Sequence, residues 1–255
     1  MDIVTCNHIS KCYRTDFFLR KRVHAVQNVS FAVKKNEVFG IIGKNGAGKS
    51  TTLKIILGFV RPDKGTATIS GIDSQESACR NHLGYLPEIP TLYPNLTLLD
   101  HLNFACSIGS IPRNEIKNRI QHVLNTVDLK QVAQKPIRQY SKGMQQRAGI
   151  ANALILNPDI LILDEPMSGL DPLGRQLVLD IINACKKRGT TVLFCSHILT
   201  DVERICDRIA IMEHGKLIDI IYPSKLTPNE SSARPTDITS PLEKYFLQKI
   251  QGTSA

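Results

Sequence analysis

The sequence of 255 residues contains no run of about 18–20 apolar residues, the length that a membrane-spanning helix needs. Residues 1–6 (Met-Asp-Ile-Val-Thr-Cys) also lack the basic stretch followed by an apolar stretch that is typical of a secretory signal peptide. No internal repeat divides the chain. We therefore expect a soluble protein that acts at a membrane only through a partner.

The seven cysteines form no C-x-x-C pair, the spacing that is typical of many metal and redox sites. Several of them lie inside apolar runs instead. Reduced, partly buried thiols in a cytosolic protein are therefore the simpler interpretation, and a cysteine metal site is not favoured.

The overall composition excludes little. A hydrophobic content of 42% and a charged content of 22% are ordinary for a globular protein, and the length allows one large domain or two smaller ones. The formal net charge of +9 fits an acidic partner, either nucleic acid or an anionic membrane surface. It fits equally well a solvated basic surface without a dedicated partner, so charge alone does not identify the function.

A glycine-rich stretch at residues 43–51 matches the pattern of a phosphate-binding loop, in which Gly, four residues, Gly, Lys and then Ser or Thr follow one another. It comprises Gly43, Lys44, Asn45, Gly46, Ala47, Gly48, Lys49, Ser50 and Thr51. Glycines allow backbone conformations that side chains would block, so that successive N–H groups can turn inward around an anion. Lys49 adds a positive charge for the β- and γ-phosphates, and the hydroxyl of Ser50 can bind Mg²⁺.

The residues around this loop support the match. Residues 38–42 form a short apolar run that is typical of a buried parallel strand, and residues 51–57 predict a helix that stops near Gly58. The N-terminus of that helix would point at the phosphates and add its partial positive charge. A chance glycine-rich turn is the alternative, but this context favours a site that binds a nucleoside triphosphate.

The rest of the chain alternates between strand-like and helix-like patterns. Residues 3–9 and 23–31 predict strands on either side of a basic and aromatic segment at 14–22, and residues 35–36 predict a turn. That segment contains Phe17 and Phe18, which pack inward at a hairpin tip or contact a membrane surface or a partner. A turn is predicted at 62–65, followed by a strand at 66–70.

Residues 74–156 are predicted to be mostly helical, including a helix at 116–124, as an insertion between two halves of an α/β core. Beyond them the pattern again predicts strands and helices in turn, as a parallel sheet covered on its faces requires. The predicted strands are 160–163, 190–195, 208–212 and 216–220, and the predicted helices are 175–188 and 199–207.

Residues 223–241 are rich in Pro, Ser, Thr and Asn and predict a linker. Residues 242–250 predict a short amphipathic helix, within a C-terminal segment of residues 242–255. The apolar stripe of this helix docks on its own domain in the simpler interpretation and on a partner in the other.

Two carboxylates, Asp164 and Glu165, end the apolar strand at 160–163. Ligands of an α/β sheet bind at the carboxyl ends of its strands. Asp164 would hold Mg²⁺, and Glu165 would orient or deprotonate the attacking water. A lone Asp-Glu pair would more simply cap a turn, but together with the phosphate-binding loop it indicates hydrolysis.

Four further residues carry weaker signals. Ser141 is a suitable N-cap for a helix that runs to about residue 156, and with Gly143 it can also form a second anion site at a helix N-terminus. His197 follows the strand at 190–195, where it is either a structural residue or within reach of a γ-phosphate. Tyr13 is either one aromatic in a half-buried sheet or a residue that stacks on adenine.

Taken together and in this order, residues 2–222 resemble the ATP-binding subunit of an ABC transporter. In that family residues 43–51 correspond to the Walker A motif, and Asp164 and Glu165 end the Walker B motif. Ser141 and Gly143 fall in the signature motif, residues 168–171 in the D-loop, and His197 at the switch histidine. The resemblance implies that Tyr13 stacks on adenine, which reverses the simpler interpretation.

The sequence departs from the family pattern at a few positions. In the signature, which usually reads Leu-Ser-Gly-Gly-Gln, Tyr140, Lys142 and Met144 replace the Leu, the first Gly and the Gln. The glutamine that normally contacts Mg²⁺ and water aligns with Glu88, which can still bind the metal but adds negative charge near the γ-phosphate. Both variants resemble the branch that pairs with ABC-2-type exporters of drugs, polysaccharides or ions. Lys44 stands where the family often has Pro.

The resemblance implies an α/β fold: a P-loop NTPase core of mostly parallel sheet, an N-terminal antiparallel β subdomain, and an inserted helical subdomain at about 85–156. The ATP-binding domain would span residues 1–222. ATP and Mg²⁺ are the implied cofactors, with Ser50, Asp164 and Glu88 at the metal. Two subunits would pair head to tail, each ATP held by the loop of one copy and the signature helix of the other.

The resemblance also implies a separate membrane permease that meets the helical region at about 88–103, and a place on the cytoplasmic face of the membrane. Transport is thus the expected function, with export the favoured direction and no nucleic acid as partner. A soluble ABC ATPase that acts on ribosomes or nucleic acid is one alternative. A regulator that binds ATP without hydrolysing it is another, which the presence of Glu165 and His197 disfavours.

Overall fold

The computed structural model describes residues 1–14, 22–226 and 240–252. The chain divides into two compact units, one made of residues 1–80 and 195–255 and the other of residues 81–194. Most of the predicted hairpin tip at 14–22 and most of the predicted linker at 223–241 lie outside the described residues. No helix in the described part of the chain has both the length and the apolar character needed to cross a bilayer.

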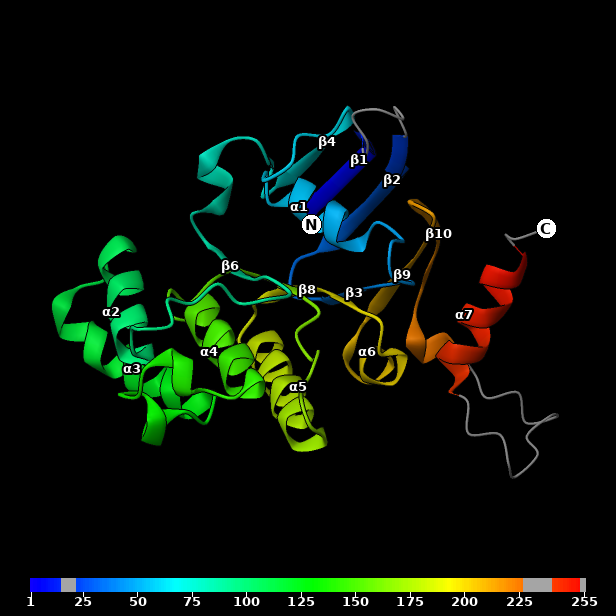
Figure 1. Cartoon of the computed structure of the whole chain (residues 1–255). Helices are drawn as coiled ribbons and strands as arrows, with labels where there is room; N and C mark the ends of the chain where they lie inside the picture. Colours follow the sequence, from blue (N-terminus) through cyan, green and yellow to red (C-terminus); the bar gives the residue numbers. More distant parts are fainter. Residues whose placement is uncertain (15–21, 227–239, 253–255) are drawn as a thin grey trace, which may run out of the picture. The chain divides into compact units, whose positions relative to one another are not determined.

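An antiparallel sheet forms one part of the first unit, with the strand order β2-β1-β4-β5 (Figure 1). Its strands are β1 (Asp2–Arg14), β2 (Arg22–Lys34), β4 (Lys64–Ile69) and β5 (Ile72–Asp73). This sheet confirms the predicted N-terminal antiparallel β subdomain. Its first strand is longer than residues 3–9. The predicted turn at 62–65 ends earlier than expected, because Lys64 and Gly65 already belong to β4.

Parallel strands form the other part of the first unit. β3 (Val38–Ile42) pairs in parallel with β9 (Arg208–Glu213), and β10 (Lys216–Ile221) returns antiparallel along β9. Helix α1 (Lys49–Ile56) follows β3, and α6 (Leu199–Ile205) packs on β3. α6 lies close to β3 at Gly40, where an added Cβ would lie only 2.9 Å from Cγ1 of Val202.

The C-terminal helix α7 (Pro241–Gly252) packs against α6 (Figure 1), and Leu242, Phe246 and Ile250 are buried. The hydroxyl of Tyr245 donates a hydrogen bond of 2.6 Å to Asp219 of β10. The prediction that the apolar stripe docks on its own domain is therefore confirmed.

Helices dominate the second unit, as predicted. α2 (Leu98–Ile108), α3 (Arg113–Thr126) and α4 (Lys142–Leu154) pack on one another, and α5 (Pro172–Lys187) follows later in the chain (Figure 1). Short 3₁₀ turns lie at Ser77–Arg80 in the first unit, at Lys130–Val132 and Ile137–Gln139 in the second, and at Pro223–Lys225 in the first.

The expectation that residues 74–156 are mostly helical is wrong at one place. Leu83–Leu86 form strand β6, which pairs in parallel with β7 (Ile160–Asp164). Four residues are too few to show a hydrophobic period, so pairing with β7 decides their conformation. β8 (Thr191–Ser196) then follows α5 and includes the division between the two units.

None of the seven cysteines, all of which lie in the described part of the chain, forms a disulfide, and all except the half-buried Cys12 are buried. Burial raises the pKa of the Cys6 thiol to about 12. Both observations agree with the predicted reduced and partly buried thiols.

Candidate functional site

The phosphate-binding loop connects β3 to α1 in the first unit, and two of its glycines lie where no side chain fits. A Cβ at Gly43 would lie 2.3 Å from the carbonyl oxygen of Met212, and one at Gly48 would lie 2.3 Å from that of Ala25. Gly48 also has a φ of 100° at the N-cap of α1. These glycines let the loop pack directly on the backbone of its own unit.

The opposite face of the loop is open. Gly46 has a φ of 82°, and a Cβ placed there would meet nothing within 4 Å. The side chain of Lys49 is buried and folds back, so that its Nζ donates hydrogen bonds to the carbonyl oxygens of Gly43 (2.8 Å) and Lys44 (3.3 Å). A positive charge thus lies beside an open glycine backbone at a helix N-terminus, which fits a phosphate chain.

The turn between β9 and β10 supports the loop from behind. The N–H of Gly215 donates a hydrogen bond of 3.0 Å to the carbonyl of Ala47. Nζ of Lys44 lies 3.6 Å from Oε1 of Glu213, whose side chain is buried. Lys44, which stands where the family often has Pro, therefore forms an ion pair with Glu213. The sequence did not predict this ion pair, because no motif links the two residues.

Tyr13 and His197 belong to the same unit as the loop. Tyr13 is half-buried on β1 opposite Val23, and Nζ of Lys11 lies 5.9 Å from the centroid of its ring. His197 is exposed directly after β8, where Oγ of Ser196 accepts a hydrogen bond of 3.0 Å from the N–H of Ile198. The roles of both residues in binding ATP stay predictions.

In the second unit, β7 delivers the two predicted carboxylates. Asp164 is its last residue and Glu165 follows it, and both are buried. Glu165 has a φ of 49°, a left-handed conformation that is unfavourable for a residue with a side chain. The carbonyl of Glu165 accepts a hydrogen bond of 3.1 Å from the N–H of Ser168, which closes the turn after the strand.

Glu88 follows the neighbouring strand. Leu86, the last residue of β6, pairs with Leu163, one residue before Asp164. Because β6 and β7 are parallel, Glu88 and the carboxylate pair both come just after strands that end at the same edge. Glu88 is exposed. Hard oxygen donors of this kind suit Mg²⁺.

Ser141 is the N-cap of α4, and its Oγ accepts a hydrogen bond of 3.2 Å from the N–H of Met144. The N-cap prediction is confirmed. Tyr140, which stands where the family has Leu, is buried, and its hydroxyl donates a hydrogen bond of 2.8 Å to the carbonyl of Val132. Burial raises the pKa of this phenol. The tyrosine thus anchors the start of the helix by a bond that Leu could not make.

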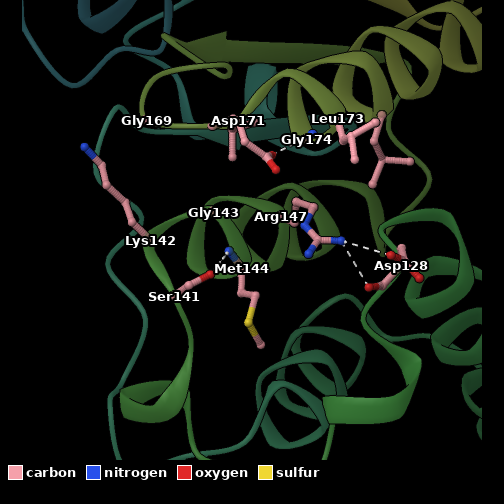
Figure 2. A pocket seen from close by; sticks show the side chains of 12 residues that line it. Asp128, Ser141, Lys142, Gly143, Met144, Arg147, Gly169, Asp171, Leu173 and Gly174 are labelled. Atoms are coloured by element: carbon pink, nitrogen blue, oxygen red, sulfur yellow. Dashed lines mark hydrogen bonds and ion pairs between the residues drawn. The ribbon is translucent and has the colours of Figure 1, made fainter.

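A cavity of about 600 Å³ lies in front of this helix N-terminus (Figure 2). Ser141, Gly143 and Met144 line one side, and the other is lined by Gly169, Leu170, Asp171, Leu173 and Gly174. A Cβ at Gly169 would lie 2.7 Å from Cε of Lys142, so the lysine side chain lies directly against this loop. Asp171 caps α5 by accepting a hydrogen bond of 2.9 Å from the N–H of Gly174.

The predicted residues therefore form two groups, one in each unit. The first unit carries the phosphate-binding loop, Tyr13 and His197, and the second carries the carboxylates and the capped helix with Ser141 and Gly143. Sequence reasoning missed one buried residue in the second group. Gln146 of α4 donates hydrogen bonds from Nε2 to the carbonyls of Glu165 (3.4 Å) and Pro166 (3.2 Å).

A parallel strand, a glycine loop and a helix in this order, with a second strand that ends in Asp164 and is followed by Glu165, define an α/β fold of the P-loop NTPase class. Residues 26–168 match the sequence profile of the ABC transporter family. The chain belongs to that family.

Similar proteins support this family membership. An uncharacterized ABC transporter ATP-binding protein of Synechocystis, sll0415, is 46% identical over 85% of this chain and 62% of its own length. The linearmycin resistance ATP-binding protein LnrL of Bacillus subtilis is 39% identical over 76% of this chain and 63% of its own length. The chain thus spans less than two thirds of the length of these relatives.

Among solved structures, the chain resembles the dimeric ATP-binding cassette MJ0796 bound to ADP and Pi in a post-hydrolysis state. The two have a TM-score of 0.80 and are 25% identical, and the match covers 87% of this chain and 99% of the other. The α/β fold predicted from the sequence is confirmed.

Proposed function

We propose that this chain is the ATP-binding and ATP-hydrolysing subunit of an ABC transporter, and that it powers export through a separate membrane subunit. The observation that carries the proposal is the open glycine loop with the buried Lys49 ammonium at the start of α1. Membership of the ABC transporter family supports ATP as the nucleotide. The relative bound to ADP and Pi supports hydrolysis.

In this proposal some of the site residues bind the nucleotide and others take part in its hydrolysis. The loop amides and Lys49 neutralise the β- and γ-phosphates, and Tyr13 stacks on the adenine. Ser50, Asp164 and Glu88 would hold Mg²⁺, which would supply further positive charge to the phosphates. Glu165 orients or deprotonates the attacking water, and His197 contacts the γ-phosphate. Such electrostatic positioning accounts for most of the acceleration in phosphoryl transfer.

Two copies of the chain pair head to tail, so that Ser141 and Gly143 of one copy contact the ATP held by the loop of the other. The dimeric state of the cassette MJ0796 supports this arrangement. Closure on ATP would drive the membrane subunit, and hydrolysis would let the dimer reopen. The chain would lie on the cytoplasmic face of the membrane, held by the permease near residues 88–103.

Export is favoured over import by the signature variant with Lys142 and Met144 and by the relative named for linearmycin resistance. The relative of Synechocystis named as an ABC transporter ATP-binding protein likewise favours a permease, rather than ribosomes or nucleic acid, as the partner. The transported substrate would be chosen by the membrane subunit.

Replacement of the proposed base tests the assignment. We expect Glu165→Gln to lower phosphate release from ATP by about 100-fold or more, because the water loses its base. The same variant should bind ATP normally and accumulate a stable ATP-bound dimer, which size-exclusion chromatography with ATP and Mg²⁺ would detect.

Lys49→Ala is the matched variant for binding. It should lose both ATP binding and the ATP-dependent dimer, because the phosphates lose a buried positive charge. Undiminished hydrolysis by Glu165→Gln would refute the base, and ATP binding unchanged in Lys49→Ala would refute the site itself.

A further inference from the structure

Gln146 is a buried polar residue in the second unit for which the proposed mechanism has no role. It lies in α4, five residues after the N-cap Ser141, and the residue is only 3% exposed. A buried carboxamide is costly unless it is hydrogen-bonded. Its Nε2 meets this need by donating to two successive carbonyls, those of Glu165 at 3.4 Å and Pro166 at 3.2 Å.

These two carbonyls directly follow the left-handed φ of Glu165 in the turn after β7. Glu165 has a φ of 49°, and left-handed backbone persists at a residue with a side chain only where surrounding contacts enforce it. The N–H of Ser168 holds the carbonyl of Glu165 from within the turn. Gln146 holds the same carbonyl from outside the turn and also donates to the carbonyl of Pro166.

The same helix also touches the segment that carries Glu88. A Cβ at Gly149, one turn beyond Gln146, would lie 2.6 Å from Cδ1 of Leu86 and 3.0 Å from Cβ of Pro90. Residues 146 and 149 are three apart and so share a face of α4. One face of this helix therefore contacts both carboxylate-bearing segments, while its N-terminus is capped by Ser141.

We propose that Gln146 is a positioning residue that holds the backbone of Glu165 in its left-handed conformation, so that the helix capped by Ser141 sets the direction of the carboxylate. This role assumes that Glu165 is the catalytic base of the proposed ATPase. The triphosphate of the partner copy, bound at Ser141, would then influence the position of the Glu165 carboxylate through helix α4, which connects the two residues. Gln146 touches neither nucleotide nor water itself.

Gln146→Met tests the role, because Met has similar length and volume but no donor. We expect kcat for ATP hydrolysis to fall by about tenfold while KM changes by less than about twofold, since the base is misplaced and the binding loop is not. Gln145→Met is the matched control on the same helix, because Gln145 bonds to the carbonyl of Tyr140 (3.2 Å). It should leave kcat within about twofold of wild type.

A double-mutant cycle separates positioning from general loss of structure. If Gln146 acts through Glu165, adding Gln146→Met to Glu165→Gln should lower the residual rate by less than about twofold. Equal tenfold losses in both backgrounds would overturn the proposal. A failure of Glu165→Gln to slow hydrolysis would instead refute the base assignment, whatever Gln146→Met does.

Hydrogen exchange gives a readout that needs no activity. Gln146→Met should speed exchange of the amides of residues 165, 167 and 168 by about fivefold or more, and Gln145→Met should not, because only the first frees the turn. Gln146→Asn, which keeps a shorter donor, should lie between Met and wild type. Unchanged exchange in Gln146→Met would overturn the proposal even if hydrolysis were never measured.

Discussion

At the scale of single residues, the phosphate-binding loop uses its glycines for two different reasons. Gly48 lies where a Cβ would meet the carbonyl of Ala25 at 2.3 Å, so the packing of the loop requires it. A Cβ at Gly46 would point into open space, so the only structural reason for a glycine at this position is its φ of 82°. The first glycine therefore serves mainly structure, and the second serves mainly the space that a phosphate needs.

Two alanine variants distinguish these reasons. Gly48→Ala should destabilise the chain by about 3 kcal/mol or more, because steric overlap adds to the cost of a left-handed side chain. Gly46→Ala should cost only about 1 kcal/mol, the conformational term alone. Urea unfolding midpoints measure the difference. Nucleotide binding should nevertheless weaken in both variants, and equal destabilisation would contradict the geometry of the loop.

At the scale of elements, α7 is held on its unit by an apolar stripe and by a small charged cluster around Asp219. The hydroxyl of Tyr245 lies 2.6 Å from Oδ2 of Asp219, and Nζ of Lys249 lies 2.8 Å from the same oxygen. The hydrogen bonds from Lys249 and then Tyr245 lower the pKa of Asp219 below its ordinary value of 3.8. The bond to Asp219 raises the pKa of Tyr245 above its ordinary value of 10.0.

These shifts make the docking of α7 dependent on pH. A lowered carboxyl pKa stabilises the docked helix above the ordinary value, and that contribution disappears as pH falls through the lowered pKa. A raised tyrosine pKa stabilises it below about pH 10, and that contribution disappears as pH rises through the raised pKa. We expect amide exchange in residues 242–250, corrected for intrinsic rates, to be slowest between these limits.

Asp219→Asn should raise this exchange at neutral pH by about threefold, as the loss of a surface ion pair predicts. In this variant the exchange should also no longer become faster as the pH falls through the lowered pKa of Asp219. Glu243→Gln is the control on the same helix, because among the described residues the Glu243 carboxylate has no hydrogen bond or ion pair. If exchange in Asp219→Asn still became faster at low pH, another titrating group would be responsible for that pH dependence.

At the scale of the whole molecule, the candidate residues are shared between two units of one chain and, in the proposed function, between two chains. Such sharing can be tested by complementation. Lys49→Ala removes the loop function and Ser141→Arg blocks the capped helix, so each variant alone should be inactive.

An equal mixture of the two variants should regain about a quarter of the wild-type rate, because half of the dimers are mixed and each mixed dimer has one intact site of two. A mixture of Lys49→Ala with the double variant should stay inactive, since neither loop is intact. Phosphate release measures both. No recovery in the first mixture would indicate that each chain uses its own loop with its own signature helix.

Much of the fold and half of the site could be predicted because their signals are local. The phosphate-binding loop needs only neighbouring glycines, a lysine and the strand and helix beside them. Ser141 was predicted as an N-cap because a cap depends on the few residues that follow it. The carboxylates Asp164 and Glu165 follow an apolar run that is visible in the sequence.

What the sequence by itself determined, therefore, is the set of chemical groups and the order of elements that carry them. Only the tertiary structure decided the conformation of β6, the ion pair of Lys44 with Glu213 and the bonds of Gln146 to the turn of Glu165. Each of these joins segments far apart in the chain, and neither hydrophobic period nor turn chemistry encodes which distant partner a short strand or a buried polar group will meet.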